Sequence, residues 1–311
     1  MPVALLTDAD RFPFDAEDRA TLADAGVELR ELQGHDPETI AAAARGADVI
    51  FVYHARFTRE LIERLDGVRL LARCGAGYDN IDVAAARERG IELVYVPDYG
   101  VDDVADHALA LLLACARKVA LCDRSVRAGS WPSYAELAPM HRILGRTLGV
   151  YGYGRIGRAL AQRARALGLE VLPYDPFVPE ASATREQVLR ESDFLSIHVP
   201  LNEKTRHAIG RDELSLMRVG AILVNTARGP VVDTVALAEA LLDGRLGGAG
   251  IDVYEEAPPP ADHPLRRCPT AVLTPHAAAY TEEALAEVRK RPLEDALRVL
   301  RGEAPRNPAP A

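Results

Sequence analysis

The sequence predicts an α/β protein built from two doubly wound parallel-sheet domains. Short β-rich runs alternate with alanine-rich helical stretches over the first hundred residues, and a second alternating series begins at residue 147. A long helical stretch without any strand signal separates the two series. Strands and helices that alternate in this way are typical of parallel sheets covered by helices.

The strand and helix signals of the first series are short and regular. Each helical stretch between two β-rich runs has room for only two or three turns, and the second and third stretches end at a glycine, a common helix stop. We expect strands at 3–6, 49–53, 68–72 and 91–96, and helices at 18–26, 36–46 and 83–90.

The second half of the chain begins with residues 101–129, which we interpret as one long helix that crosses between the domains. The final helical stretch, 281–302, contains Pro292, so we expect a kink or a break there. The last residues, 303–311, are expected to fray. We expect strands at 147–151, 170–174, 193–199, 221–225, 249–253 and 271–274.

The composition excludes several functional classes. The chain has 311 residues, of which 48% are hydrophobic and 27% charged, which is enough for two globular domains. Its net charge of −9 disfavours non-specific binding to nucleic acid or to anionic membranes. No signal-peptide pattern and no apolar run of about 18 residues is present. The four cysteines form no Cys-x-x-Cys pair, and we therefore expect a cytoplasmic protein.

A glycine motif follows the run at 147–151. Gly152, Gly154 and Gly157 form the pattern G-x-G-x-x-G directly before a helical stretch, and Asp175 ends the next β-rich run 18 residues after Gly157 (175 − 157). Such glycines let the backbone approach a pyrophosphate at a helix N-terminus, while the acid binds the ribose hydroxyls. Because an acid stands at 175, the motif favours NAD over NADP.

Polar residues also follow the later strands of this series. Pro200 and Thr205 come after one strand, Thr226 to Arg228 after the next, then Asp252, and finally His276. Since a doubly wound sheet binds its ligands at the carboxyl ends of its strands, we expect these residues to line one crevice.

Arg228 and His276 are the residues that we expect to carry the chemistry. A guanidinium matches a carboxylate in a bidentate fashion, and an imidazole can exchange a proton near neutral pH. The pair therefore suits the reduction of a carbonyl in an anionic substrate. The alternatives, that Arg228 caps a helix and that His276 faces the core, stay open on the sequence alone.

Several segments together resemble one family. GYGRIG, SDFLSIHVPL, ILVNTARGPVVD and LTPH, in this order and spacing, are similar to the D-isomer-specific 2-hydroxyacid dehydrogenases, and RCGAGYDNID and VADHALALLLACAR extend the resemblance over nearly the whole chain. The last of these segments, together with HAAAYTEEAL, is most similar to the subgroup near the C-terminal-binding-protein corepressors.

The resemblance implies a discontinuous, flavodoxin-like outer substrate domain, 1–98 and 283–311, and an inner Rossmann NAD-binding domain, 99–282. It implies that Arg228 and His276 are catalytic and that amides around Ala76 and Gly77 hold the substrate carboxylate, with His54 as a further candidate. A homodimer through the NAD domain, with a contribution from the stretch around Trp131, is also implied. The cofactor-lining residues implied are Val104, Tyr153, Gly154, Arg155, Ile156, Gly157, Asp175, Pro200, Thr205, Thr226, Ala227, Arg228, Asp252 and His276.

The chain departs from the family pattern at one catalytic position. The family glutamate that hydrogen-bonds the histidine falls five residues after Asp252 (252 + 5), where this chain has Ala257. One hypothesis is that Glu255 or Glu256 reaches His276 through a shifted turn. A second is that no acid pairs with His276, so that the enzyme is slow or works at lower pH.

The sequence therefore predicts an NAD-dependent oxidoreductase that interconverts a small 2-oxo acid and its D-2-hydroxy acid. The rival hypothesis is a non-catalytic protein that senses NAD(H) and binds partners, like the corepressors. No His, Cys or Asp cluster has metal-ligand spacing, so no metal is expected.

Overall fold

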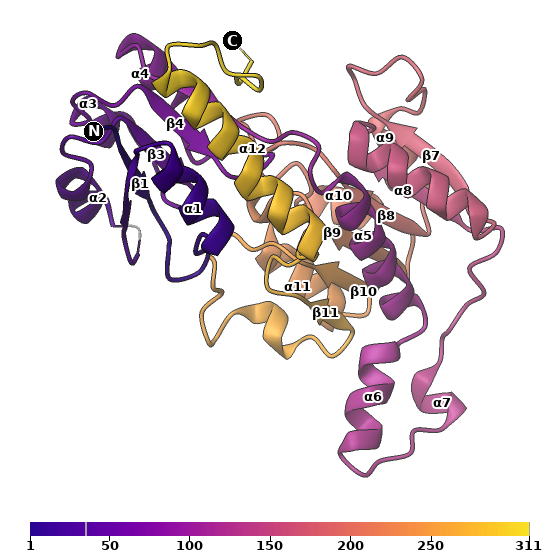
Figure 1. Cartoon of the computed structure of the whole chain (residues 1–311). Helices are drawn as coiled ribbons and strands as arrows, with labels where there is room; N and C mark the ends of the chain where they lie inside the picture. The colour runs from indigo at the N-terminus through magenta and orange to yellow at the C-terminus, as the bar shows by residue number, and fades with distance from the viewer. Residues whose placement is uncertain (35, 311) are drawn as a thin grey trace. The chain divides into compact units, whose positions relative to one another are not determined.

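The computed structural model describes residues 1–34 and 36–310 and contains two parallel β-sheets (Figure 1). The chain divides into an outer unit, Met1–Tyr99 with Thr281–Ala311, and an inner unit, Gly100–Tyr280. The α/β class with two parallel sheets that the sequence predicts is confirmed. The domain boundaries expected from the sequence lie within two residues of this division.

The outer unit contains a five-stranded parallel sheet in the order β2-β1-β3-β4-β5, which is the flavodoxin-like order. Helices α1 and α12 pack against each other in this unit (Figure 1). Its elements are β1 Val3–Leu6, α1 Ala16–Asp24, β2 Glu28–Glu31, α2 Pro37–Ala43, β3 Val49–Val52, α3 Arg59–Glu63, β4 Leu70–Arg73, α4 Val83–Glu88, β5 Glu92–Val94 and α12 Glu282–Leu300.

In the outer unit, strands β1, β3 and β4 form because they are apolar on both faces. Leu5, Ile50 and Leu71 belong to the core on one face of the sheet. Their chain neighbours Leu6 and Phe51 belong to the core on the other face. Successive side chains of a strand point to opposite faces, so a continuous apolar run buries the strand on both sides.

Strand β2 was not among the expected strands. Its sequence, Glu28–Glu31, has one apolar residue, and its side chains are only partly buried or exposed. The strand lies at the edge of the sheet, where pairing with β1 and not an apolar pattern defines it.

The expectation of a frayed C-terminal tail is wrong for the described residues. The backbone amide of Tyr95 donates to Asn307, and that of Ala309 donates to Leu93, so the tail is hydrogen-bonded along β5. The buried carboxylate of Asp295 accepts the amide of Arg306 at 2.6 Å. Of the kink or break expected at Pro292, the break is absent, because α12 continues through this residue.

The inner unit contains a six-stranded parallel sheet in the order β11-β10-β9-β8-β6-β7. The strand order reverses at β6, with β7 on one side and β8 on the other, so the sheet has a switch point at the carboxyl end of β6. Its elements are α5 Val101–Ala116, α6 Val119–Arg127, α7 Tyr134–Leu137, β6 Thr147–Tyr151, α8 Arg155–Ala166, β7 Glu170–Tyr174, α9 Arg185–Glu191, β8 Phe194–Ile197, α10 Arg211–Leu216, β9 Ala221–Asn225, η1 Gly229–Val231, α11 Thr234–Leu242, β10 Leu246–Ile251, η2 Pro264–Arg267 and β11 Ala271–Leu273.

The single helix expected over 101–129 is two helices. Lys118 has φ 50° and ψ 33°, a left-handed conformation that ends α5 and begins α6 in a new direction. Helix α5 packs on β10 and against α8, whereas α6 and α7 project away from the inner sheet (Figure 1). The hydrophobic pattern runs through the junction, so the sequence alone does not reveal the turn.

Candidate functional site

The glycine motif forms the turn between β6 and α8. Gly152 has φ +101°, and an ideal Cβ there would lie 2.7 Å from the carbonyl carbon of His198. A Cβ on Gly157 would lie 2.2 Å from the oxygen of Gly152, so both positions require glycine. Around Gly154, by contrast, no described atom lies within 4 Å of an added Cβ. The turn therefore offers backbone and the N-terminus of α8 to an anionic ligand.

Asp175 lies beside this turn, at the carboxyl end of β7. One carboxylate oxygen accepts the backbone amide of Tyr153 at 2.9 Å, and the other accepts the amide of Phe177 at 2.9 Å. Both bonds fix the carboxylate next to the glycine motif. This is the position at which a ribose diol would find an acceptor.

The loop after β8 carries His198, Pro200 and Thr205. The hydroxyl of Thr205 donates to the carbonyl of Pro200 at 2.6 Å, which brings these two residues into one turn. The ring of His198 makes a 2.9 Å hydrogen bond with the hydroxyl of Ser196. Burial lowers the pKa of His198 to about 4, so this imidazole is neutral at physiological pH.

The turn after β9 is shaped by Asn225, a buried residue that was not among the site residues expected from the sequence. Its amide nitrogen donates to the carbonyl of Arg228 at 2.9 Å, and its side-chain oxygen accepts the amide of Ala227 at 3.0 Å. Thr226 is buried within this turn, and its hydroxyl has no hydrogen-bond partner among residues 1–34 and 36–310. A buried hydroxyl in this state suits a ligand that brings an acceptor or donor.

Asp252 follows β10 and is fully buried. Its carboxylate accepts the hydroxyl of Thr274 at 2.6 Å and the amides of Ala277 and Ala278 at 2.9 and 3.0 Å. Its backbone carbonyl accepts the amide of His276 at 2.8 Å, and His276 has a positive φ of 58°. Asp252 therefore fixes the backbone of His276 and of the two residues after it, and His276 itself has an uncommon conformation.

His107 joins this network from α5, although the sequence showed no motif for it. Its Nε2 lies 3.0 Å from the hydroxyl of Thr274 and 3.6 Å from the carboxylate of Asp252. Val104, one of the expected cofactor residues, is half-buried one helical turn earlier. A polar residue on the mostly apolar α5 is the only sequence signal that could have drawn attention to His107.

The carboxylate of Glu255 binds Thr234 and His207, contacts that neither hypothesis about the missing acid includes. One carboxylate oxygen accepts both the amide and the hydroxyl of Thr234, at 3.2 and 2.7 Å. The other lies 3.0 Å from Nε2 of His207. Burial raises the pKa of Glu255, but hydrogen bonds from Thr234 and His207 outweigh this effect and leave the pKa below its ordinary value. Glu256 and Ala257 are exposed.

The remaining candidates lie in the outer unit. Ala76 and Gly77 follow β4, and His54 follows β3, so all three are at the carboxyl edge of the outer sheet. His54 is exposed, its amide donates to the carboxylate of Asp8 at 3.2 Å, and its ring is 5.1 Å from that of Phe12.

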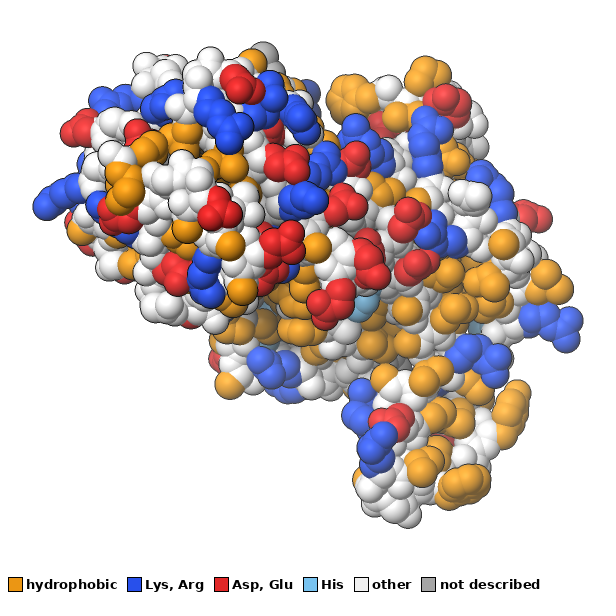
Figure 2. Space-filling view, viewed as in Figure 1, with side chains coloured by type: hydrophobic (Ala, Val, Ile, Leu, Met, Phe, Trp, Pro, Cys, Tyr) orange, Lys and Arg blue, Asp and Glu red, His pale blue; other side chains and the backbone are white. Residues whose placement is uncertain are grey.

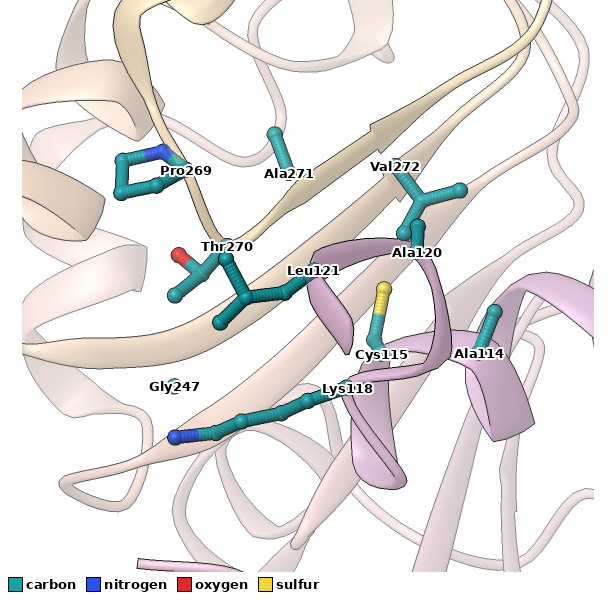
Figure 3. A pocket seen from close by; sticks show the side chains of 10 residues that line it. All are labelled: Ala114, Cys115, Lys118, Ala120, Leu121, Gly247, Pro269, Thr270, Ala271 and Val272. Atoms are coloured by element: carbon teal, nitrogen blue, oxygen red, sulfur yellow. The ribbon is translucent and has the colours of Figure 1, made fainter. Parts of the chain in front are cut away.

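A pocket in the inner unit lies at the opposite edge of the sheet, at the amino ends of β10 and β11 (Figure 3). Gly247, Ala271 and Lys118 are among its lining residues. Burial raises the pKa of the Cys115 thiol in its wall to about 12, so this thiol stays protonated. The pocket contains none of the candidate residues.

The described part of the chain has neither a metal-binding cluster nor a membrane-crossing helix. Residues 1–34 and 36–310 contain no group of three or more His, Cys, Asp or Glu side chains placed to hold a metal ion. None of their helices is long and apolar enough to cross a membrane.

Comparison with known proteins places these features in a family. Residues 109–278 match the model described as D-isomer specific 2-hydroxyacid dehydrogenase, NAD binding domain. A glyoxylate reductase from Korarchaeum cryptofilum is 43% identical over 258 residues, which cover 80% of this chain and 78% of the relative. A D-3-phosphoglycerate dehydrogenase from Methanocaldococcus jannaschii is 37% identical over 301 residues. That match covers 94% of this chain, which thus spans only 57% of that relative's length.

Among solved structures, the D-lactate dehydrogenase from Aquifex aeolicus complexed with NAD and lactic acid matches with a TM-score of 0.88 and 27% identity. The match covers 99% of this chain and all of that one. The matched relatives are named as dehydrogenases and reductases. The expected similarity of VADHALALLLACAR and HAAAYTEEAL to the corepressor subgroup is therefore not supported.

Proposed function

Because the chain belongs to the D-isomer-specific 2-hydroxyacid dehydrogenase family and is an NAD-dependent enzyme of that class, we propose that it interconverts a small 2-oxo acid, such as glyoxylate or hydroxypyruvate, and its 2-hydroxy acid. The observation that carries the proposal is the set of polar residues at the carboxyl edge of the inner sheet. Asp175, the turn ending at Arg228, and the Asp252–His276 pair all lie at this edge, beside the glycine turn.

The inner unit fits NAD in three respects. The glycine turn leaves backbone exposed for a pyrophosphate at the N-terminus of α8, and Asp175 is held beside it for the ribose hydroxyls. The buried hydroxyl of Thr226 is left for a further polar contact. A fixed carboxylate at 175 repels the 2′-phosphate that distinguishes NADP.

Two side chains are proposed to act on the substrate. NADH would supply the hydride that reaches the carbonyl carbon. Arg228, at the end of a turn braced by Asn225, would hold the anionic substrate and polarise its carbonyl group. His276, held by Asp252 through its backbone, would donate the proton to the carbonyl oxygen. In the opposite direction, His276 would accept that proton.

The contacts of Glu255 bear on which acid could replace the family glutamate as the partner of His276. Thr234 and His207 hold both oxygens of the Glu255 carboxylate, which argues against Glu255 as the substitute for the family acid at position 257. Glu256 is exposed and lies five residues after the end of β10 (256 − 251), so it remains the proposed candidate of the first hypothesis.

The proposal is tested by following NADH oxidation with glyoxylate, hydroxypyruvate, pyruvate and bulkier 2-oxo acids, in parallel with NADH binding by fluorescence. We expect turnover of at least one small 2-oxo acid, loss of turnover in Arg228→Gln and His276→Asn, and NADH binding retained in the His276 variant. Binding of NADH without turnover of any acid in the panel would refute the proposed interconversion of 2-oxo and 2-hydroxy acids and would support the NAD(H)-sensing alternative.

We also propose that the protein is a homodimer through the inner unit. Hydrophobic side chains gather on the projecting part of the surface formed by α6 and α7 (Figure 2). Trp131 is 87% exposed and Tyr134 is 80% exposed there, an exposure that large aromatic residues rarely keep without a partner. Light scattering after gel filtration should give a dimer for the wild type and a monomer for Trp131→Glu. A monomeric wild type at micromolar concentration would refute this.

A further inference from the structure

Glu255 connects three loops at the carboxyl edge of the inner sheet. It belongs to the loop after β10, Thr234 begins α11 after the turn that follows β9, and His207 belongs to the loop after β8. Because its two oxygens bind Thr234 and His207 separately, a single carboxylate ties all three loops together. These are the loops that carry Thr205, Thr226, Arg228 and Asp252.

The backbone of the same loops is in close contact. An ideal Cβ on Gly229, the residue after Arg228, would lie 1.9 Å from the carbonyl carbon of Tyr254 and 2.4 Å from the amide nitrogen of Glu255. The Arg228 turn therefore lies directly against the Tyr254–Glu255 peptide. The amide of His207 donates to the carbonyl of Pro230 at 2.7 Å, which attaches the third loop to the same turn.

The electrostatics favour an anion at this point. Thr234 is the first residue of α11, a helix of nine residues, and its amide is one of the donors at the positive end of the helix. Asp233 caps the next two amides, of Val235 and Ala236, so Glu255 completes the set by binding the amide of Thr234. The side chain of Glu255 is about one-third exposed, and its charge is satisfied by three donors.

We propose that Glu255 is a positioning residue for Arg228: its carboxylate joins Thr234 and His207 and so holds the turn after β9 in the place where Arg228 meets the substrate. This inference rests on the proposed function. It gives the first glutamate of DVYEEA a role distinct from that of the acid expected at position 257. In this scheme the effect on Arg228 passes through residues 229–234.

The test compares Glu255→Ala, Glu255→Gln, Thr234→Val and Thr234→Ser, with Glu239→Gln as a matched control. Glu239 lies on the same helix α11 and forms an exposed ion pair with Arg211, away from the three loops. Each variant is assayed for kcat and KM with the best 2-oxo acid, for NADH affinity by fluorescence, and for thermal unfolding.

We expect kcat/KM for the 2-oxo acid to fall about tenfold to a hundredfold in Glu255→Ala and Thr234→Val, the range that a small misplacement of a catalytic group produces. Thr234→Ser keeps the hydroxyl and should restore most of the loss. NADH affinity should change much less, because Asp175 and the glycine turn do not depend on Glu255. Wild-type kinetics in Glu255→Ala, or equal losses in Thr234→Ser and Thr234→Val, would overturn the proposal.

Hydrogen exchange separates this proposal from the proposed function. In the wild type without substrate, the hydrogen-bonded amides of residues 231–234 should be protected, and Glu255→Gln and Glu255→Ala should lose that protection while the strands of the inner sheet keep theirs. If the wild type turns over no 2-oxo acid, the proposed function fails, yet this measurement still decides whether Glu255 holds the turn. Unchanged exchange at the amides of 231–234 in a folded Glu255→Ala protein would refute the inference.

Discussion

Substituting Gly229 by alanine tests how tightly the Arg228 turn is packed. The added Cβ would lie 1.9 Å from the carbonyl carbon of Tyr254 and 2.0 Å from its oxygen, whereas non-bonded carbon atoms settle at about 3.5–4.0 Å. Relief requires the two backbones to separate by more than about 1 Å, because neither atom belongs to a flexible side chain. Overpacking costs about 1–3 kcal/mol in general, and a backbone obstacle places this case at about 3 kcal/mol.

The same displacement would move Arg228 away from the place where we propose that it binds the substrate. We therefore expect kcat/KM to fall about a hundredfold in Gly229→Ala, since a shift of about 1 Å in a catalytic group costs this much. Gly210→Ala is the matched control: it is another non-helical glycine of the inner unit, and the nearest atom to its added Cβ, in the side chain of Glu213, lies at 3.5 Å, an ordinary contact.

Urea unfolding gives the free energy of unfolding of both variants, and steady-state kinetics give their kcat and KM. Gly210→Ala, at the half-buried N-cap position of α10, should cost no more than about 1 kcal/mol, clearly less than Gly229→Ala. If Gly229→Ala unfolds with the wild-type free energy and keeps the wild-type kcat, then the close approach of the two loops is not the constraint that we infer.

Three further predictions concern single contacts. Burial keeps the pKa of His198 at about 4 in the folded state, below its ordinary 6.5, so the stability that depends on its neutral form is complete above pH 6.5 and is lost as the pH falls towards 4. Between pH 7 and pH 5 this costs at most about 2 kcal/mol, and urea unfolding of His198→Gln should show a pH dependence smaller by that amount; an equal dependence would contradict it. Thr274→Val removes a 2.6 Å hydrogen bond to the buried Asp252 and should cost about 2 kcal/mol in urea unfolding, with Thr274→Ser near the wild type; equal stability of the two variants would count against the network. Asp175→Ala should weaken NADH binding at least about tenfold in a fluorescence titration, which is the worth of one charge-assisted hydrogen bond, and undiminished affinity would show that the ribose is held elsewhere.

The glycine motif and the strand ends were predictable because each depends on local rules. Gly152 adopts a positive φ, Gly157 has no room for a side chain, and Asp175 ends its strand, all as the motif requires. The apolar strands of both sheets could also be predicted from the sequence, because buried parallel strands are continuous apolar runs.

Other elements depend on contacts with distant parts of the chain. Strand β2 is polar and becomes a strand by pairing with β1 at the edge of the sheet. The C-terminal tail, rich in proline and polar residues, is ordered by β5 and by the buried Asp295. The turn at Lys118 interrupts a helical pattern that continues on both sides of it.

The sequence by itself determined the α/β class, the two-sheet organisation, the dinucleotide motif and the residue types available for catalysis, since periodicity, turn residues and motif spacing are properties of neighbouring residues. Only the tertiary structure decided which polar groups meet. It placed His107 and Thr274 on Asp252, left the hydroxyl of Thr226 without a partner in the described chain, and gave Glu255 to Thr234 and His207. These contacts join residues from different strand ends, and parallel strands bring such residues to one edge of a sheet only after the whole sheet has formed.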